Sequence, residues 1–190
     1  MDVLQNSITE RTKYIMTSVN NPTGTAYNEK TAKEIVDIAG ENKVMILSDE
    51  MYGMITYDGI DYPSMAKVAG DVPVVIVNGM SKFFMRTGWR VGYVTFHDPE
   101  GKISEVKHAV TMYKSLYGHN ASRVTPIVYA AAKAYSDPYQ GGFDLVKKCH
   151  PLRLHHEAPR RDGGHKLREA KGQLLHLSPC ARYREGMEDG

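Results

Sequence analysis

The chain has 190 residues, of which 42% are apolar and 24% charged, a composition that suits one globular domain with a core. It lacks the roughly 18 consecutive apolar residues of a membrane span. The first residues carry no secretory signal, so we expect a cytoplasmic protein. Two cysteines are too few for a disulfide framework, and a net charge of +2 gives no electrostatic case for nucleic acid. We therefore expect neither a membrane nor a nucleic-acid partner.

The composition changes near residue 148. Residues 149–190 hold eight basic and six acidic side chains, and thus the whole net charge of +2. They contain no Val, Ile, Thr or Phe, whereas Val, Ile and Thr alone make up 37 of the first 148 residues. We expect residues 1–148 to form part of one domain, and residues 149–190 to form no domain and to be irregular or disordered.

The first elements of the chain are a strand, a turn and a helix. Residues 13–18 are β-branched and aromatic, which predicts a strand, and the Asn, Pro and Gly of residues 20–24 predict a turn. Asn28 is a candidate N-cap for a helix over residues 29–39, whose apolar positions fall on one face. Gly40 is expected to end that helix.

The following segments continue the alternation of strands and helices. Residues 44–47 and 74–77 are continuous apolar runs, typical of strands buried on both faces of a parallel sheet. Residues 91–96 are a further strand candidate, and helices are predicted over residues 103–117 and 122–135. This alternation predicts an α/β fold with a mainly parallel sheet flanked by helices.

Reactive side chains follow three of the predicted strands. Asn21 comes after the first strand, Asp49 after the second and Lys82 after the third. In open parallel sheets, ligands bind beyond the carboxyl ends of the strands. The topology therefore predicts one site at this edge of the sheet.

Lys82 lies among small and apolar residues in the sequence NGMSKFF. A lysine removed from water has a lowered pKa and can attack a carbonyl to form a Schiff base. The alternative is a surface lysine whose stem packs beside the aromatic residues, and this alternative is favoured by the local sequence alone.

Asp49 and Tyr52 stand in the sequence SDEMY at the end of an apolar strand. A carboxylate at this place could hold a protonated ring nitrogen, while the Tyr52 hydroxyl donates to a neighbouring oxygen. The alternative is that Ser48 or Asp49 caps the N-terminus of a helix.

Arg90 lies eight residues after Lys82, between Gly88 and Gly92. A guanidinium flanked by glycines suits close, bidentate binding of a phosphate. The alternative is an ordinary ion pair at a strand edge.

Taken together, these motifs resemble the class I/II aminotransferases, which are pyridoxal-phosphate enzymes of fold type I. The resemblance rests on NPTG at residues 21–24, SDEMY at residues 48–52, SK at residues 81–82 and GWRVGY at residues 88–93. Their order and spacing match the second half of that family's large domain. The sequence around Lys82 looks most like that of the alanine- or aspartate-type branch of archaea and bacteria.

The resemblance implies a role for each candidate residue and a cofactor, pyridoxal 5'-phosphate. Lys82 would bind the cofactor aldehyde covalently and carry the proton of the substrate α-carbon. Asp49 would keep the ring nitrogen protonated, Tyr52 and Asn21 would hydrogen-bond the ring's phenolic oxygen, and Arg90 would bind the phosphate. The substrates would be an amino acid and a 2-oxo acid, in an enzyme that is usually a homodimer. Many relatives have a hydroxyl residue where this chain has Gly79.

The resemblance also implies segments that the 190 residues do not include. Family members are about twice as long, with a phosphate-cupping loop and a ring-stacking aromatic upstream, and a small domain with a carboxylate-binding arginine downstream. We therefore expect a weakly active or inactive chain. The alternatives are a catalytically dead fragment, or a fold-type I lyase or decarboxylase that shares Lys82, Asp49 and Arg90.

Residues 149–190 are expected to be read out of frame. A back-translation of residues 170–179, read one base later, gives PKGSFYIFP, which resembles the aromatic strand that opens the family's small domain. The Cys and His residues of this tail have no zinc-finger or zinc-ribbon spacing, so we predict no metal site. Acidic residues interrupt the basic cluster of residues 160–168, which favours a solvated segment over a nucleic-acid patch.

Overall fold

The computed structural model describes residues 1–19, 26–56, 62–117 and 124–136. Asn21 and the whole of residues 149–190 lie outside these ranges, and so do the predictions made for them. No helix in the described ranges is both long and apolar enough to cross a membrane.

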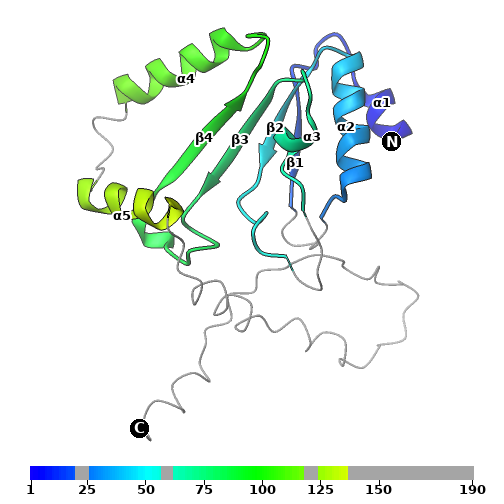
Figure 1. Ribbon diagram of the computed structural model, residues 1–190. Helices are drawn as coiled ribbons and strands as arrows, with labels where there is room; N and C mark the ends of the chain where they lie inside the picture. Colours follow the sequence, from blue (N-terminus) through cyan, green and yellow to red (C-terminus); the bar gives the residue numbers. More distant parts are fainter. Residues whose placement is uncertain (20–25, 57–61, 118–123, 137–190) are drawn as a thin grey trace, which may run out of the picture.

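Four strands form one sheet in the order β1 (Tyr14–Ser18), β2 (Met45–Asp49), β3 (Val74–Gly79) and β4 (Gly92–His97) (Figure 1). The first three strands run parallel, and β4 runs antiparallel to β3. The predicted α/β fold with a mainly parallel sheet is confirmed. The segment between β3 and β4 contains only a short 3-10 helix, η1 (Thr87–Trp89), so the chain reverses direction without a crossover helix.

The helices are α1 (Asp2–Ser7), α2 (Glu29–Glu41), α3 (Met65–Val68), α4 (Ser104–Tyr117) and α5 (Thr125–Ser136). The sequence predicted α2, α4 and α5 to within a few residues. It did not predict α1 and α3, because six and four residues are too few to show helical periodicity.

The two ends of α2 test the sequence prediction in detail. The Asn28 cap is confirmed, since its Oδ1 accepts a hydrogen bond of 2.8 Å from the backbone N–H of Thr31. Gly40 does not end the helix. The chain instead turns at Lys43, whose φ is 54°, in the left-handed region. A Cβ on Gly40 would lie 3.1 Å from Val72 Cγ2, so this glycine lets α2 approach the turn that precedes β3.

Helices α2 and α3 cover one face of the sheet and form the core with it (Figure 1). The core cluster consists of Ile15, Ala32, Ile35, Val36, Ala39, Val44, Ile46, Met65, Ala69, Val74 and Ile76. Strand alternation turns Tyr14 and Met16 to the other face, where they are 49% and 62% exposed. Residues 44–47 are therefore not buried on both faces as predicted, because Met45 and Leu47 are only half-buried.

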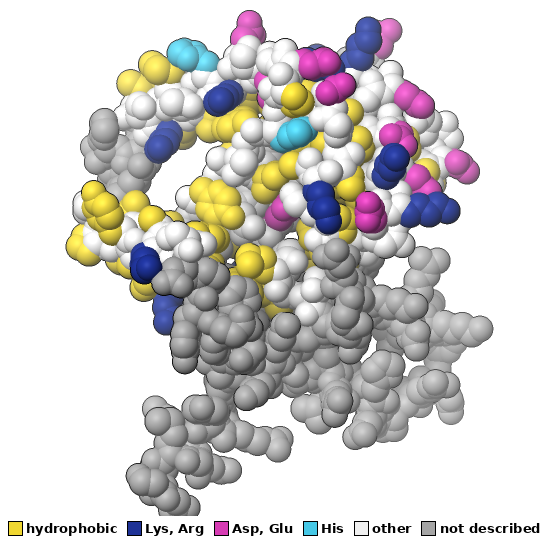
Figure 2. All heavy atoms as spheres, viewed as in Figure 1, with side chains coloured by type: hydrophobic (Ala, Val, Ile, Leu, Met, Phe, Trp, Pro, Cys, Tyr) yellow, Lys and Arg dark blue, Asp and Glu magenta, His cyan; other side chains and the backbone are white. Residues whose placement is uncertain are grey.

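Apolar side chains also lie on the surface of α5. Val124, Val128 and Tyr129 are all exposed, and hydrophobic atoms gather over this helix in Figure 2. Scattered apolar residues are normal on a protein surface, but a contiguous group indicates a face that another element covers.

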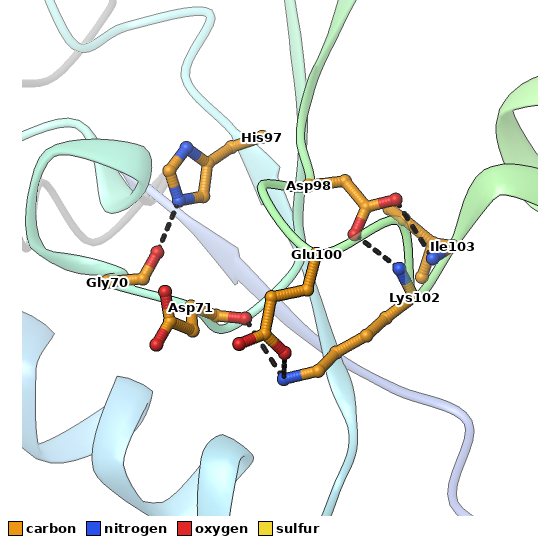
Figure 3. A network of polar contacts seen from close by, with 7 residues as sticks. All are labelled: Gly70, Asp71, His97, Asp98, Glu100, Lys102 and Ile103. Carbon is orange, nitrogen blue, oxygen red and sulfur yellow. Dashed lines mark hydrogen bonds and ion pairs between the residues drawn. The ribbon is translucent and has the colours of Figure 1, made fainter.

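A polar network closes the amino edge of the sheet, at the start of β3 and the end of β4 (Figure 3). His97 Nε2 donates to the carbonyl of Gly70 at 2.7 Å, and the Asp98 carboxylate accepts from the backbone N–H groups of Lys102 and Ile103. Lys102 forms an ion pair with Glu100, whose carboxylate raises the lysine's pKa. These polar groups bind one another and the backbone of the adjoining loops, and they lie at the opposite end of β3 from Lys82.

Candidate active site

The candidate site lies at the carboxyl edge of the parallel strands. The register aligns Ser18, Asp49 and Val77, which are the final or near-final residues of β1, β2 and β3. Neighbouring strands are about 4.8 Å apart, so the segments that leave these three positions start side by side. The prediction that this edge brings distant parts of the sequence together is confirmed for the segments after β2 and β3.

Lys82 and Tyr52 meet across this edge. The Nζ atom of Lys82 lies 5.5 Å from the centroid of the Tyr52 ring, within the range of a cation–π contact. Both side chains are half-buried. The contact joins the segment after β3 to the segment after β2, although the residues are 30 positions apart in the sequence.

Asp49 ends β2 and shapes the turn that carries Tyr52. Its Oδ1 accepts a hydrogen bond of 3.0 Å from the backbone N–H of Met51, which is an Asx turn. The alternative of a helix N-cap is wrong, because residues 51–54 form a turn and no helix begins there. Within the described ranges, the other carboxylate oxygen of Asp49 accepts no hydrogen bond and is available to a ligand.

The segment between β3 and β4 is a closed loop that holds Lys82 and Arg90. The N–H of Met80 donates to the carbonyl of Val91 at 3.0 Å, which closes the loop at its base. The N–H of Met85 donates to the carbonyl of Lys82 at 3.0 Å, and Met85 has a φ of 52°. This non-glycine residue is held in a costly left-handed conformation by the surrounding loop.

Arg90 is exposed at the end of this loop and is also left-handed, with a φ of 54°. Its Nη1 donates to the carbonyl of Thr87 at 3.1 Å. It forms no ion pair with any described residue, so the alternative of an ordinary ion pair finds no support in this part of the chain. The guanidinium keeps most of its donors for an anion.

Aromatic rings hold the Lys82 loop against α5. Phe84 makes edge contacts with both Phe83 and Tyr135, at centroid distances of 5.0 and 4.9 Å, and Tyr135 in turn contacts Tyr93 of β4 at 5.2 Å. Such pairs contribute about 0.5–1.5 kcal/mol each beyond the apolar area that they bury. Burial in this cluster, together with Tyr93, raises the pKa of Tyr135. The residues next to Lys82 are thus fixed by packing.

The close surroundings of Gly79 explain why this position holds a glycine. A Cβ at this position would lie 2.7 Å from the carbonyl oxygen of Val91 and 3.0 Å from the Cα of Gly92. Both are backbone atoms of the closing segment, so no hydroxyl side chain fits here without moving β4. A glycine at this position therefore allows the close backbone contact that closes the loop.

The sequence did not single out two residues of the site region, Glu50 and Tyr62. Glu50 is buried and accepts three hydrogen bonds, and Tyr62 packs beside it. Burial and the Glu50 carboxylate raise the pKa of Tyr62 to about 12. Glu50 is part of the SDEMY motif, but the neighbouring residues do not reveal that its side chain is buried or that its partners Ser64 and Met65 lie 14 and 15 residues away.

Comparison with known proteins agrees with this arrangement. The family model for aminotransferase class I and II matches residues 1–148. The chain belongs to this family. An aspartate aminotransferase of Bacillus sp. (strain YM-2) is 35% identical over 155 residues, and an aromatic-amino-acid aminotransferase of Thermococcus litoralis is 38% identical over 139 residues. The solved structure of an alanine aminotransferase from Pyrococcus furiosus superposes with a TM-score of 0.72 at 39% identity.

The comparisons also show how much of the family fold is present. The matches cover 80% of this chain but 37% of the Bacillus relative, and 82% of this chain but 39% of the Pyrococcus structure. The chain thus spans well under half the length of these aminotransferases. Class I/II aminotransferases depend on pyridoxal phosphate.

Proposed function

We propose that this chain is the cofactor-binding part of a pyridoxal-phosphate-dependent aminotransferase, which transfers an amino group between an amino acid and a 2-oxo acid. The observation that carries the proposal is the meeting of Lys82 and Tyr52 at the edge where Asp49 offers an oxygen. The names of the relatives differ in their substrate, so they select no single amino acid.

The donor set of this edge fits the cofactor group by group. A primary amine suits an aldehyde, a carboxylate suits a protonated ring nitrogen, and a guanidinium suits a phosphate. Lys82, Asp49 and Arg90 supply these three groups, and Tyr52 supplies a phenol beside the amine. Asn21, which lies outside the described residues, is proposed as a second hydrogen-bond partner of the ring's phenolic oxygen.

Pyridoxal phosphate, when bound, supplies an aldehyde and a protonated ring that withdraws electrons from the substrate α-carbon. Asp49 would accept the hydrogen bond of the protonated ring nitrogen, and the hydrogen bond from the backbone N–H of Met51 would orient its carboxylate. Lys82 would hold the cofactor aldehyde through Nζ, and its amine would carry the proton of the substrate α-carbon. Arg90 would bind the phosphate, and Tyr52 would hydrogen-bond the ring's phenolic oxygen.

Covalent labelling of the full chain tests this proposal. Incubation with pyridoxal phosphate, reduction with borohydride and peptide mass spectrometry should place the label on Lys82. The Lys82→Ala variant should lose both the label and the visible absorbance of the bound cofactor. The matched control is Lys107→Ala, which removes an exposed lysine of α4 and should change neither. Equal labelling of many lysines, with no preference for Lys82, would contradict the proposal.

Turnover assays separate the competing functions. We expect little or no transamination by the 190-residue chain, because it spans only 37% of a relative such as the Bacillus enzyme. Cofactor binding without turnover would fit a chain that holds only the cofactor-binding part of the enzyme. Release of the amino-acid carboxylate as carbon dioxide would favour a decarboxylase. Homodimerisation and a cytoplasmic location are part of the proposal, and size-exclusion chromatography checks the first.

We propose further that residues 149–190 translate a shifted reading frame. The family match ends at residue 148, where the composition also changes. Sequencing the gene around codons 146–151 in independent isolates tests this proposal. A one-base difference that restores a family-like sequence would support it, and an identical reading frame in every close relative would exclude it.

A further inference from the structure

Glu50 is a buried carboxylate directly behind the candidate site. It follows Asp49 at the end of β2 and is only 8% exposed. Its backbone N–H donates to the carbonyl of Val77 at 3.0 Å, which extends the pairing of β2 with β3 by one residue. A carboxylate is seldom buried unless polar partners compensate for the lost water.

Those partners come from both sides of the turn that carries Tyr52. Glu50 Oε1 accepts from Ser48 Oγ at 3.1 Å, from Ser64 Oγ at 2.9 Å and from the backbone N–H of Met65 at 2.9 Å. Ser48 belongs to β2, whereas Ser64 and Met65 lie at the start of α3, 14 and 15 residues after Glu50. One oxygen atom therefore fastens the end of β2 to the start of α3.

The turn itself packs tightly against this anchor. The N–H of Gly53 donates to the carbonyl of Glu50 at 2.9 Å. A Cβ on Gly53 would lie 3.1 Å from Cδ1 of Tyr62, so the turn rests directly on the Tyr62 ring. Tyr52 sits between these two fixed points, and its ring faces the Lys82 amine.

We propose that Glu50 is the positioning residue of the site, whose carboxylate fixes residues 49–53 and thereby aims Asp49 and Tyr52 at the ligand bound beside Lys82. Glu50 does not touch that ligand. Its effect passes through the anchored turn. The inference rests on the proposed function for the identity of the ligand, while the anchoring itself is a property of the chain alone.

Substitutions at Glu50 should weaken the site in a graded way. Glu50→Ala leaves two hydroxyl groups and one buried N–H without their acceptor, so the turn loosens. Glu50→Gln keeps a carbonyl oxygen at the same place but loses the charge, and its amide nitrogen is a donor where an acceptor stood. The conservative variant should therefore rescue part of the loss. Losing the hydrogen-bond partner of a metal-binding residue costs about tenfold or more in affinity, and we expect a loss of this size here.

The experiment measures pyridoxal-phosphate affinity and amide hydrogen exchange on the full chain, with Glu105→Gln on exposed α4 as the matched control. We expect the apparent Kd to rise about tenfold in Glu50→Ala and by less in Glu50→Gln. Faster exchange should be confined to the N–H groups of Met51, Gly53 and Met65. A merely structural role would instead speed exchange throughout β1–β3.

Each outcome decides between the claims. Unchanged affinity in both Glu50 variants, with normal binding by the wild type, would overturn the positioning role and leave the proposed function intact. If the wild type itself binds no pyridoxal phosphate, the proposed function fails. Hydrogen exchange is then the measurement that tests whether Glu50 anchors the turn. If Glu50→Ala does not fold, Ser64→Ala removes only one of the three donors. Exchange should then be faster at the same N–H groups, but by a smaller factor. Unchanged exchange in that variant and in Glu50→Gln would refute the anchor.

Discussion

The substitution Gly79→Ala places one methyl group against the backbone that leads into β4. The added Cβ would lie 2.7 Å from the carbonyl oxygen of Val91, and these backbone atoms cannot rotate away as a flexible side chain could. Overpacking of this kind costs about 1–3 kcal/mol. Replacing a glycine also restricts the unfolded chain, which returns about 0.4–1 kcal/mol. The clash is the larger effect, so we expect a net loss of about 1–2 kcal/mol.

Urea unfolding of the full chain, followed by circular dichroism, measures this loss. With a slope of about 2 kcal/mol per molar urea, the midpoint should fall by about 0.5–1 M. Gly88→Ala is the matched control on the same loop, because a Cβ there meets nothing within 4 Å. The control should unfold at the wild-type midpoint or slightly above it.

The same substitution should also weaken ligand binding at the site. Val91 accepts the hydrogen bond of Met80 that closes the Lys82 loop, so a displaced β4 opens this loop at its base. We expect weaker pyridoxal-phosphate binding in Gly79→Ala than in Gly88→Ala. An unfolding midpoint for Gly79→Ala at or above that of the wild type would refute the reasoning.

Two further predictions concern the α2 end and a buried tyrosine. Lys43→Gly should raise the free energy of unfolding by about 0.5–1 kcal/mol, because glycine adopts the φ of 54° without strain, and a lower melting temperature would contradict this. Tyr62 has a pKa raised from 10.0 to about 12, so the folded chain keeps a proton that the unfolded chain releases. Its stabilisation is present below pH 10 and is lost as the pH rises from 10 to 12. Urea midpoints across this range should fall in the wild type, and an equal fall in Tyr62→Phe would exclude Tyr62 as the cause.

Local sequence was sufficient wherever one element could be read by itself. The Asn28 cap and the strands of residues 13–18 and 74–77 follow from side-chain chemistry and periodicity, and the structure has them within a residue or two. The helix end at Gly40 was misjudged, because a glycine can serve a close contact as well as a turn. Its neighbour Val72 lies 32 positions away, beyond the reach of any local pattern.

The sequence by itself indicated the chemical groups proposed for the site and the edge of the sheet where Lys82 and Tyr52 meet, because both residues follow strands whose direction the alternation of elements predicts. Only the tertiary structure decided how those groups are held. The burial of Glu50, its two distant donors Ser64 and Met65, and the close contact at Gly79 all depend on residues that meet only in the folded chain. Hydrogen bonds and steric contacts act over a few ångströms in space, and a linear pattern records no such distance.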